Sequence, residues 1–487
     1  MVSLTYQDIK IKQIEDFVWE IPQTGKMRVP GRIYASRKMM EKIISEDESL
    51  KQVINVAMLP GIQKYSLAMP DIHWGYGFPI GGVAATDLEE GVVSPGGVGY
   101  DINCGVRLAR TNLVFNEINK RVEHIIKSLF NHVPTGVGSS GAVRKLSVAE
   151  TKKVLQKGAE WAVENGFGIS TDLEYTEEKG RLSSANPEHV SGRAIERGQH
   201  QVGTLGSGNH FLELQIVDQI YDQQAAAAFG LFPDQLVLMI HCGSRGLGHQ
   251  VCDDYLRVFN QAISKYKIVL PDKQLICAPI QSNEGERYLG AMSAAANFAW
   301  ANRQVIMELT KKSLLQTLQI SERNLGFQLV YDVCHNIAKI EEHVVDGKNK
   351  KVCVHRKGAT RAFPLGHHLT PEKYRTIGQP VLVPGDMGRY SFVAVGCQKA
   401  MDETFGSTCH GAGRVKSRHK ALREGKGRDL FAEMKRMGVF VQARGRRTVA
   451  EEMPSAYKDV ADVMEAMHKS GISRKVAKLK PIGVIKG

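Results

Sequence analysis

The chain has 487 residues, of which 43% are hydrophobic and 24% charged, and its formal net charge is +13. This apolar content excludes an intrinsically disordered chain and allows a large buried core. No stretch approaches the roughly 18 consecutive apolar residues that a membrane helix needs, and residues 1–20 carry charges where a signal peptide would be apolar. We therefore expect a cytoplasmic protein that does not associate with membranes.

The first two hundred residues predict a mixture of helices, tight turns and loops. Residues 37–58 have helical spacing, and the glycine-dense stretch 69–106 indicates backbone that turns tightly or closely approaches a ligand. Ser147 and Glu150 form a capping-box pattern, which predicts a helix that ends near residue 164. The polar stretch 170–190 predicts a long loop or a small insertion.

Two later segments share one local design, a short apolar strand that delivers a histidine. Leu236–Ile240 precedes His241, and Phe327–Val333 is followed by a cysteine and then His335. Strand ends that meet at one edge of a sheet commonly form a site, so we expect these two imidazoles to converge. Residues 290–318, between the two strands, predict one long helix or two broken ones.

The last 150 residues predict a hairpin, a strand and two helices. A turn at Asp346-Gly347 centres a hairpin over 344–355, Pro380–Val383 predicts a strand, and helices are expected near 428–437 and 457–470. Residues 411–487 contain 19 lysines and arginines against 8 aspartates and glutamates, a balance of +11. Such a basic end is typical of proteins that bind a polyanion such as nucleic acid, although a solvated basic surface gives the same pattern.

Cysteine and histidine placement points to a metal site. The eight cysteines are scattered without a CxxC pair, which favours reduced thiols over disulfides. Five candidate ligands lie in turns that carry glycine or asparagine: Asp101, Cys104, His210, His241 and His335. A carboxylate, a thiolate and imidazoles suit zinc, iron(II), cobalt or manganese better than magnesium, and a bridging thiolate would allow two ions. Each residue alone is more often an inert core thiol or a hydrogen-bonded histidine, so the prediction rests on the set.

A second candidate is the segment Thr404-Phe-Gly-Ser-Thr-Cys-His410-Gly-Ala-Gly-Arg414. Small residues flank His410, and the backbone N–H groups of Gly411 and Gly413 could bind phosphate. The pattern favours a nucleophile or a phosphate contact, and a turn whose histidine merely caps a neighbour is the alternative. The loop from Val383 to Arg389 lacks the GxxxxGK[ST] pattern, so it is not a Walker-type phosphate loop.

In their order along nearly the whole chain, the assembled motifs resemble the RtcB family of RNA-splicing ligases. They are Asp71-Ile-His-Trp-Gly, Asp101-Ile-Asn-Cys-Gly-Val-Arg, Gly-Asn209-His210-Phe-Leu-Glu213, His241-Cys-Gly-Ser-Arg-Gly, Cys334-His335-Asn336, Cys-His410-Gly-Ala-Gly-Arg and Pro481-Ile-Gly-Val-Ile-Lys486-Gly. The resemblance implies a manganese-dependent, GTP-consuming ligase that joins an RNA 3′-phosphate or 2′,3′-cyclic phosphate end to a 5′-hydroxyl end, in tRNA splicing or RNA repair. It also makes an archease-like activator a possible partner.

The resemblance further implies roles for individual residues. Asp101, Cys104 and His210 would bind one manganese ion, and Cys104 would bridge to a second ion that His241 and His335 complete. His410 would form a covalent histidine–GMP intermediate. The nucleotide-binding positions would be Asn209, His210, Phe211, Leu212, Glu213, His335, Asn336, Pro384, Gly385, Asp386, Met387, Ser391, His410, Gly411, Ala412, Gly413, Tyr457 and Lys486, with Tyr457 suited to stack on guanine.

One loop departs from the family pattern. Where the family has Pro-Gly-Ser-Met-Gly-Thr, this chain has Pro-Gly-Asp386-Met-Gly-Arg389. An acid beside a triphosphate should be unfavourable unless Arg389 pairs with it or with the phosphate. The departure bears on nucleotide affinity and leaves the implied reaction class unchanged.

From the resemblance we expect a mixed α/β (α+β) fold, with central mixed sheets flanked by helices. One large catalytic domain would span 1–487 and include both the 170–190 stretch and the basic region 411–487. Two other functions remain open on the residues alone. A metal-dependent phosphoesterase or nuclease would act without GTP and without a covalent adduct, and an RNA-binding protein with a structural metal would show no turnover.

Overall fold

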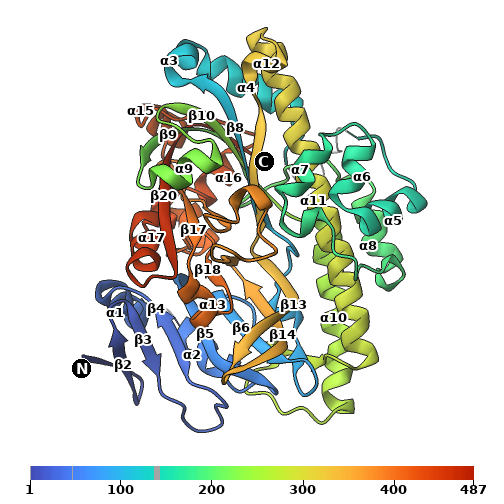
Figure 1. The fold of residues 1–487 in the computed structure, drawn as a ribbon, viewed down its shortest axis with the longest axis vertical. Helices are drawn as coiled ribbons and strands as arrows, with labels where there is room; N and C mark the ends of the chain where they lie inside the picture. Colours follow the sequence, from blue (N-terminus) through green and yellow to red (C-terminus); the bar gives the residue numbers. More distant parts are fainter. Residues whose placement is uncertain (1, 47, 137–142) are drawn as a thin grey trace.

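The computed structural model describes residues 2–46, 48–136 and 143–487, and its core is built on two large sheets (Figure 1). The first sheet has the order β1-β2-β3-β4-β5-β6-β14-β13. Its neighbours are antiparallel except for the parallel pair β4–β5. Its strands are β1 (Ser3–Tyr6), β2 (Ile9–Glu15), β3 (Val18–Ile21), β4 (Gly31–Tyr34), β5 (Ile62–His73), β6 (Ile80–Asp87), β14 (Lys348–Lys357) and β13 (Asn336–Val345).

The second sheet has the order β12-β8-β10-β9-β20-β17-β16, and β19 adds to β20 in parallel. Its strands are β12 (Gln328–Cys334), β8 (Gly105–Val114), β10 (Gln235–Cys242), β9 (Phe211–Ile220), β20 (Ser473–Lys486), β17 (Ser391–Gly396), β16 (Pro380–Val383) and β19 (Phe440–Ala443). Two short pairs complete the β structure, β7 (Val92–Val93) with β11 (Ala278–Pro279), and β15 (Ala359–Arg361) with β18 (Ser407–Cys409). The expected mixed α/β class is confirmed.

Helices cover the sheets, and the longest, α11 (Asn283–Leu318), runs along one side of the molecule next to α10 (Arg245–Lys265) (Figure 1). The Ser282 hydroxyl caps α11 by accepting the N–H of Gly285. The others are α1 (Arg37–Glu46), α2 (Ser49–Val56), α3 (Phe115–Ile118), α4 (Val122–His132), α5 (Val148–Lys157), α6 (Ala159–Glu164), α7 (Ser170–Glu174), α8 (Gly192–Gly198), α9 (Gln223–Phe229), α12 (Glu322–Leu325), α13 (Gln398–Thr404), α14 (Arg418–Gly425), α15 (Leu430–Arg436), α16 (Arg446–Glu451) and α17 (Val460–Lys469).

The local predictions hold, with some differences. The Ser147 capping box is formed, but the helix that it opens breaks at Gly158, where φ is +60°, and resumes as α6. The stretch 170–190, expected to be a long loop or a small insertion, contains α7 and two single turns of 3-10 helix. It is also tied into the core, since the buried Glu177 carboxylate lies 2.5 Å from Nζ of the buried Lys339.

The first strand of the predicted hairpin, β13, follows directly after the last residues of β12 and so connects the two sheets. β13 and β14 pair with a turn at Asp346 and Gly347, both at positive φ, as a two-residue hairpin turn requires. β12 belongs to the second sheet and ends at Cys334, while β13 belongs to the first sheet and begins at Asn336. His335 is therefore the one residue that links β12 of the second sheet to β13 of the first.

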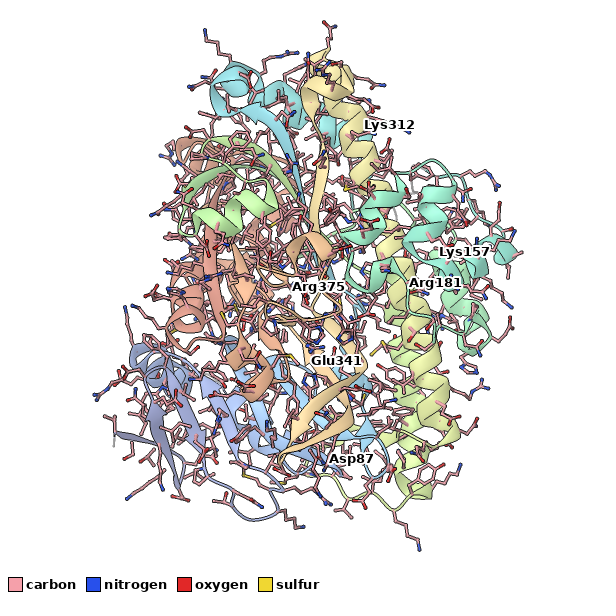
Figure 2. The ribbon with its side chains drawn as sticks, viewed as in Figure 1. Asp87, Lys157, Arg181, Lys312, Glu341 and Arg375 are labelled. Carbon is pink, nitrogen blue, oxygen red and sulfur yellow. The ribbon has the colours of Figure 1, made fainter. Side chains whose placement is uncertain are left out.

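Charged side chains lie mostly on the outer faces of the helices, and a few charged side chains are buried between helices and strands (Figure 2). Lys157 and Arg181, labelled in Figure 2, form ion pairs with Glu164 and Glu160. Glu341 on β13, also labelled, is buried and accepts two hydrogen bonds from a buried arginine, at 2.6 and 2.8 Å. Within the described residues, no helix is long and apolar enough to cross a membrane.

Candidate active site

Strand direction brings the candidate ligands to one edge of the second sheet. β10 and β12 both run antiparallel to β8, so their carboxyl ends lie where β8 begins. β9 also begins at that edge, because Phe211 pairs with His241 in the register of β9 and β10. The loop that carries Asp101 and Cys104, and the residues His210, His241 and His335, therefore meet there.

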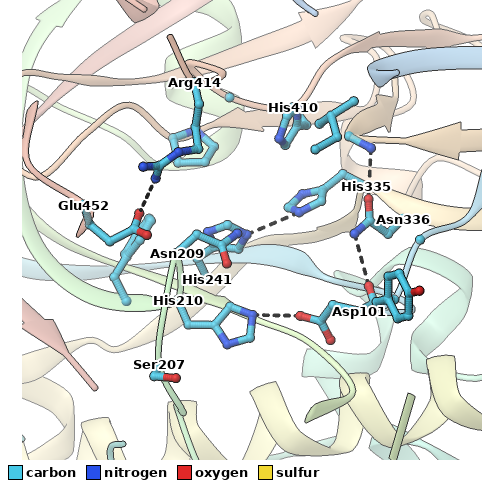
Figure 3. Close-up of a pocket in the computed structure, with 18 of the residues that line it drawn as sticks. Asp101, Ser207, Asn209, His210, His241, His335, Asn336, His410, Arg414 and Glu452 are labelled. Carbon is cyan, nitrogen blue, oxygen red and sulfur yellow. Dashed lines mark hydrogen bonds and ion pairs between the residues drawn. The ribbon is translucent and has the colours of Figure 1, made fainter. Parts of the chain in front are cut away.

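The five side chains form two groups of three that share Cys104, and Figure 3 shows the other four, Asp101, His210, His241 and His335. The Cys104 sulfur lies 3.2 Å from Nε2 of His241 and 3.5 Å from Nε2 of His210. Nε2 of His210 lies 2.8 Å from Oδ2 of Asp101, and Nε2 of His241 lies 3.2 Å from Nε2 of His335. In each group, all ligand atoms lie within 4.8 Å of one another.

The protonation of two of the histidines, His241 and His335, fits metal binding. Burial lowers the pKa values of His241 and His335 well below the ordinary histidine value, and neighbouring histidines lower them further. Both rings therefore stay in the neutral form that binds metals. Burial raises the pKa of the Cys104 thiol to about 12, so only a bound cation would make it a thiolate at neutral pH.

Neighbouring groups orient the cluster. The Leu205 carbonyl lies 3.0 Å from Nδ1 of His210 and can accept a proton held there, an arrangement in which Nε2 is the atom that would bind a metal. Asn336 donates to the Asp101 carbonyl at 3.1 Å and accepts the N–H of Gly358 at 2.9 Å. The loop between Asp101 and Cys104 is thereby fixed to the junction of the two sheets.

His410 approaches the cluster from the first-sheet side. It follows β18, and its ring centroid lies 4.8 Å from that of His335. Its Nδ1 lies 2.5 Å from Oδ2 of Asp71 on β5, and the same oxygen accepts the backbone N–H groups of His410 at 3.0 Å and Gly411 at 3.3 Å. Gly413, at φ +70°, must be glycine, because a Cβ atom there would lie 2.3 Å from the Asp71 carbonyl oxygen.

Sequence reasoning assigned no role to Asp71, although a lone acid within the apolar strand Leu67–Ile72 was a usable signal. The side chain is fully buried. Burial raises its pKa, but the His410 ring, the two hydrogen bonds from His410 and the charge of Lys458 lower it by more, so the net pKa lies below the usual aspartate value. An ionised Asp71 can only accept from Nδ1 of His410, so in the neutral ring it favours the tautomer whose lone pair is on Nε2.

A cavity of about 580 Å³ lies between the two sheets and joins these parts. Most of the predicted residues line it, namely Asp101, Asn209, His210, Phe211, Glu213, His241, His335, Asn336, Pro384, Gly385, Asp386, Met387, His410, Gly411, Ala412, Gly413, Tyr457 and Lys486. Cys104 lies beneath the wall and is 2% exposed. Further residues line it that the site prediction omitted: His73, Tyr76, Tyr100, Arg197, Gln201, Arg245, His249, Lys357, Arg414, Arg418 and Glu452.

Two predicted nucleotide contacts do not line the cavity. Leu212 alternates with Phe211 and Glu213 along β9, so its side chain points to the opposite face and joins a buried hydrophobic cluster. Ser391 is buried behind the loop, where its hydroxyl accepts the N–H of Gly385 at 3.2 Å. Ser391 therefore holds the backbone of the 384–389 loop through this hydrogen bond.

The end of the cavity away from Asp101 carries a polar network around Tyr457. The Tyr457 hydroxyl donates to the buried Glu452, which also binds Arg414 at 3.2 Å (Figure 3). Burial raises the pKa of Glu213 to about 8, and burial lowers the pKa of Lys486. An aromatic ring beside a buried acid and a buried amine can bind a planar, hydrogen-bonding base.

The unusual Asp386 is neutralised by Arg389. Nε of Arg389 lies 2.5 Å from Oδ2 of Asp386, while Nη2 donates to the carbonyls of Tyr457 at 3.1 Å and Lys458 at 2.9 Å. From the sequence, Arg389 was expected to pair either with Asp386 or with the phosphate, and the structure has the pairing with Asp386. Arg389 ties the 384–389 loop to the segment that carries Tyr457, and the acid does not face the cavity unpaired.

Comparison with known proteins gives one consistent result. A profile of the family described as "tRNA-splicing ligase RtcB" matches residues 52–487. A protein of that name from Thermococcus kodakarensis is 54% identical over 98% of this chain and 99% of its own length. One from Archaeoglobus fulgidus is likewise 54% identical over the same shares, and an "RNA-splicing ligase RtcB" from Mycobacterium bovis is 50% identical over 90% of this chain and all of its own.

Proposed function

The chain belongs to the RtcB family of tRNA-splicing ligases, and we propose that it joins RNA 3′-phosphate or 2′,3′-cyclic phosphate ends to 5′-hydroxyl ends through a covalent intermediate on His410. It is an RNA ligase by family. The observation that carries the covalent step is the pairing of Asp71 with Nδ1 of His410, beside the ligand cluster of the same cavity.

Two manganese ions are the cations that we propose for the cluster. Asp101, Cys104 and His210 would hold one, and Cys104, His241 and His335 the other. When bound, two such ions neutralise charge on a phosphoryl group and polarise it for displacement. The mixed donor set of carboxylate, thiol and imidazole supports manganese over magnesium or calcium.

His410 supplies the nucleophile. With its proton held on Nδ1 by Asp71, Nε2 attacks the α-phosphorus of GTP, and the bond to the bridging oxygen breaks to release pyrophosphate. The guanylyl group then passes to the RNA 3′-phosphate and frees His410. The 5′-hydroxyl finally attacks the activated 3′-phosphorus, and GMP leaves. Tyr457, Glu213 and Lys486 would hold the guanine, and the loop 384–387 would lie along the phosphates.

The basic region would hold the RNA backbone. A groove of about 520 Å³ is lined by α14, the start of α15 and α16, and its cationic side chains are Arg423, Lys426, Arg428, Arg446 and Arg447. α14 begins at Arg418, which also lines the active-site cavity, so the same helix borders both the groove and the cavity. Charge of this kind binds phosphates with strong salt dependence and little sequence preference.

The family resemblance also supports three further proposals: one catalytic domain over 1–487, a cytoplasmic location and an archease-like activator. The direct test of function is ligation of a 3′-phosphate RNA to a 5′-hydroxyl RNA, with GTP and manganese each omitted in turn. We expect a joined product only when both are present. RNA cleavage or phosphate release without GTP would identify a phosphoesterase, and RNA binding with no turnover a binding protein.

A further inference from the structure

Three aromatic rings lie together on the cavity wall next to Asp101, and the ligation chemistry proposed above uses none of them. Tyr76 and Tyr100 pack edge to face with ring centroids 5.8 Å apart and an interplanar angle of 71°. The Tyr100 ring lies 6.1 Å from that of His249 at 42°. All three residues line the cavity, and Tyr100 directly precedes Asp101 in the chain.

These tyrosines contribute little to the core. Both are partly exposed, and neither belongs to a hydrophobic cluster of the described residues. Among the hydrogen bonds of those residues, none involves either phenolic oxygen. A tyrosine in the core usually pairs its hydroxyl and buries its ring, so these two present aromatic surface to whatever enters the cavity.

The backbone under Tyr76 is held in place by its neighbours. Lys357 donates from Nζ to the Tyr76 carbonyl at 2.5 Å and to the Phe78 carbonyl at 3.1 Å. The N–H of Gly77 donates to the side chain of Gln274 at 3.0 Å. A ring on such a fixed loop loses little conformational entropy when a flat ligand stacks against it.

We propose that Tyr76 and Tyr100 form a stacking platform for the terminal nucleobase of an RNA end. The proposal rests on the proposed function, because it takes RNA as the substrate. Every base has a π-face that stacks on aromatic rings, so the platform would accept any sequence, as a general ligase needs. A base held beside Tyr100 places its own phosphate near Asp101 and the rest of the cluster, where the reaction occurs.

The two RNA strands offer the same chemistry, so the test uses both. One RNA carries 2-aminopurine as the last base of a 3′-phosphate strand, and the other carries it as the first base of a 5′-hydroxyl strand. Each is titrated with the full-length chain without GTP, and quenching of the fluorescence is measured. We expect quenching of the strand that stacks, retained in Tyr76→Phe and lost in Tyr76→Ala, with Kd raised roughly 5- to 150-fold.

An abasic terminus makes the test specific. RNA that lacks the terminal base should bind the wild-type chain and Tyr76→Ala equally, because the stacked pair is broken in both. Tyr76→Leu, which keeps apolar volume without a π-face, replaces Tyr76→Ala if that variant does not fold. Tyr221→Ala is the control, since Tyr221 is 41% exposed and does not line the cavity.

The outcomes separate this proposal from the proposed function. Equal quenching and affinity in Tyr76→Ala and Tyr76→Phe, or an equal loss with abasic and intact RNA, would overturn the stacking platform. Guanylylation of the wild-type chain is measured separately with GTP and manganese. A chain that stacks RNA but never forms the adduct would refute the proposed reaction and leave the platform standing.

Discussion

The Nδ1 atom of His410 lies 2.5 Å from Oδ2 of Asp71, a buried carboxylate from a strand 339 residues earlier in the chain. The same oxygen accepts the backbone N–H groups of His410 and Gly411. Ring position, tautomer and loop conformation are thus set by one carboxylate. Nε2 is the ring nitrogen that would act as the nucleophile in the proposed reaction.

This pairing predicts that Asp71→Asn slows guanylylation of His410 about 10²- to 10⁴-fold. An amide can donate to Nδ1 and so stabilise the tautomer whose proton blocks Nε2. The rate is measured as the intact-mass increase with GTP and manganese over time. Asp87→Asn, on the same sheet and outside the cavity, is the control and should react at the wild-type rate. An unchanged rate in Asp71→Asn would show that the carboxylate does not orient the ring.

Cys104 is shared by both ligand groups, so its removal should affect both ions. We expect Cys104→Ala to lower the manganese content from about two ions per chain to well below one. Asp101→Ala and His335→Ala should each weaken one ion more than the other. Elemental analysis after gel filtration measures the content, and Cys277→Ala, a buried cysteine outside the cluster, is the control. Two ions retained in Cys104→Ala would rule out a bridging thiolate.

Glu213 predicts a pH dependence of stability. Burial raises its pKa from 4.5 to about 8 in the folded chain, so the folded state holds a proton that the unfolded chain has released. Stability from this group is fully present below pH 4.5 and is lost as the pH rises toward 8. Glu213→Gln should flatten the fall in the unfolding midpoint over that window, in the metal-free and nucleotide-free chain. An unchanged slope would place the pKa of Glu213 near its ordinary value.

Asp386 and Arg389 should behave as a coupled pair. Arg389→Thr leaves a buried carboxylate without its cation, so it should destabilise the chain by about 3–5 kcal/mol or raise the KM for GTP. The double change Asp386→Ser/Arg389→Thr, which restores the loop typical of the family, should recover most of that stability. Denaturant unfolding of the two single variants and the double variant measures the coupling. Additive effects would show that the pair does not interact.

The basic groove predicts a salt dependence of RNA binding. Changing Arg423, Lys426 and Arg446 to glutamine should lower the slope of log K against log salt by about 0.7 for each RNA phosphate that the variant no longer neutralises. The matched control changes Lys10, Lys12 and Lys26, which lie at the other end of the chain and outside both cavities. Equal slopes for the groove variant and the control would mean that RNA does not bind in the groove.

The sequence was most informative where an apolar strand ends directly at a candidate metal ligand. Apolar runs that end in His241 and His335 predicted two strands with their histidines at one edge, and the structure has β10 and β12 parallel in direction on either side of β8. It could not predict which distant strand faces His410, because the Asp71 contact depends on the packing of β5 against β18. That these residues bind manganese and GTP stays a prediction.

Leu212 and Ser391 stay predicted as nucleotide contacts, although neither residue lines the cavity. Leu212 lies on β9, where side chains alternate across the strand and only every second one faces a given side, and Ser391 lies behind the loop with its hydroxyl on the N–H of Gly385. The motif covered consecutive residues, whereas the cavity selects Phe211 and Glu213. The Asp386–Arg389 pairing was one of two arrangements considered, and only the observed path of the loop distinguishes them.

The most direct test of the account is the mass of the intact chain after incubation with GTP and manganese. We predict the addition of one guanylyl group, mapped by peptide analysis to His410, with none in His410→Ala and none when manganese is omitted. An adduct that persists in His410→Ala, or ligation of RNA by a chain that never carries the guanylyl group, would contradict the central claim that His410 is the nucleophile.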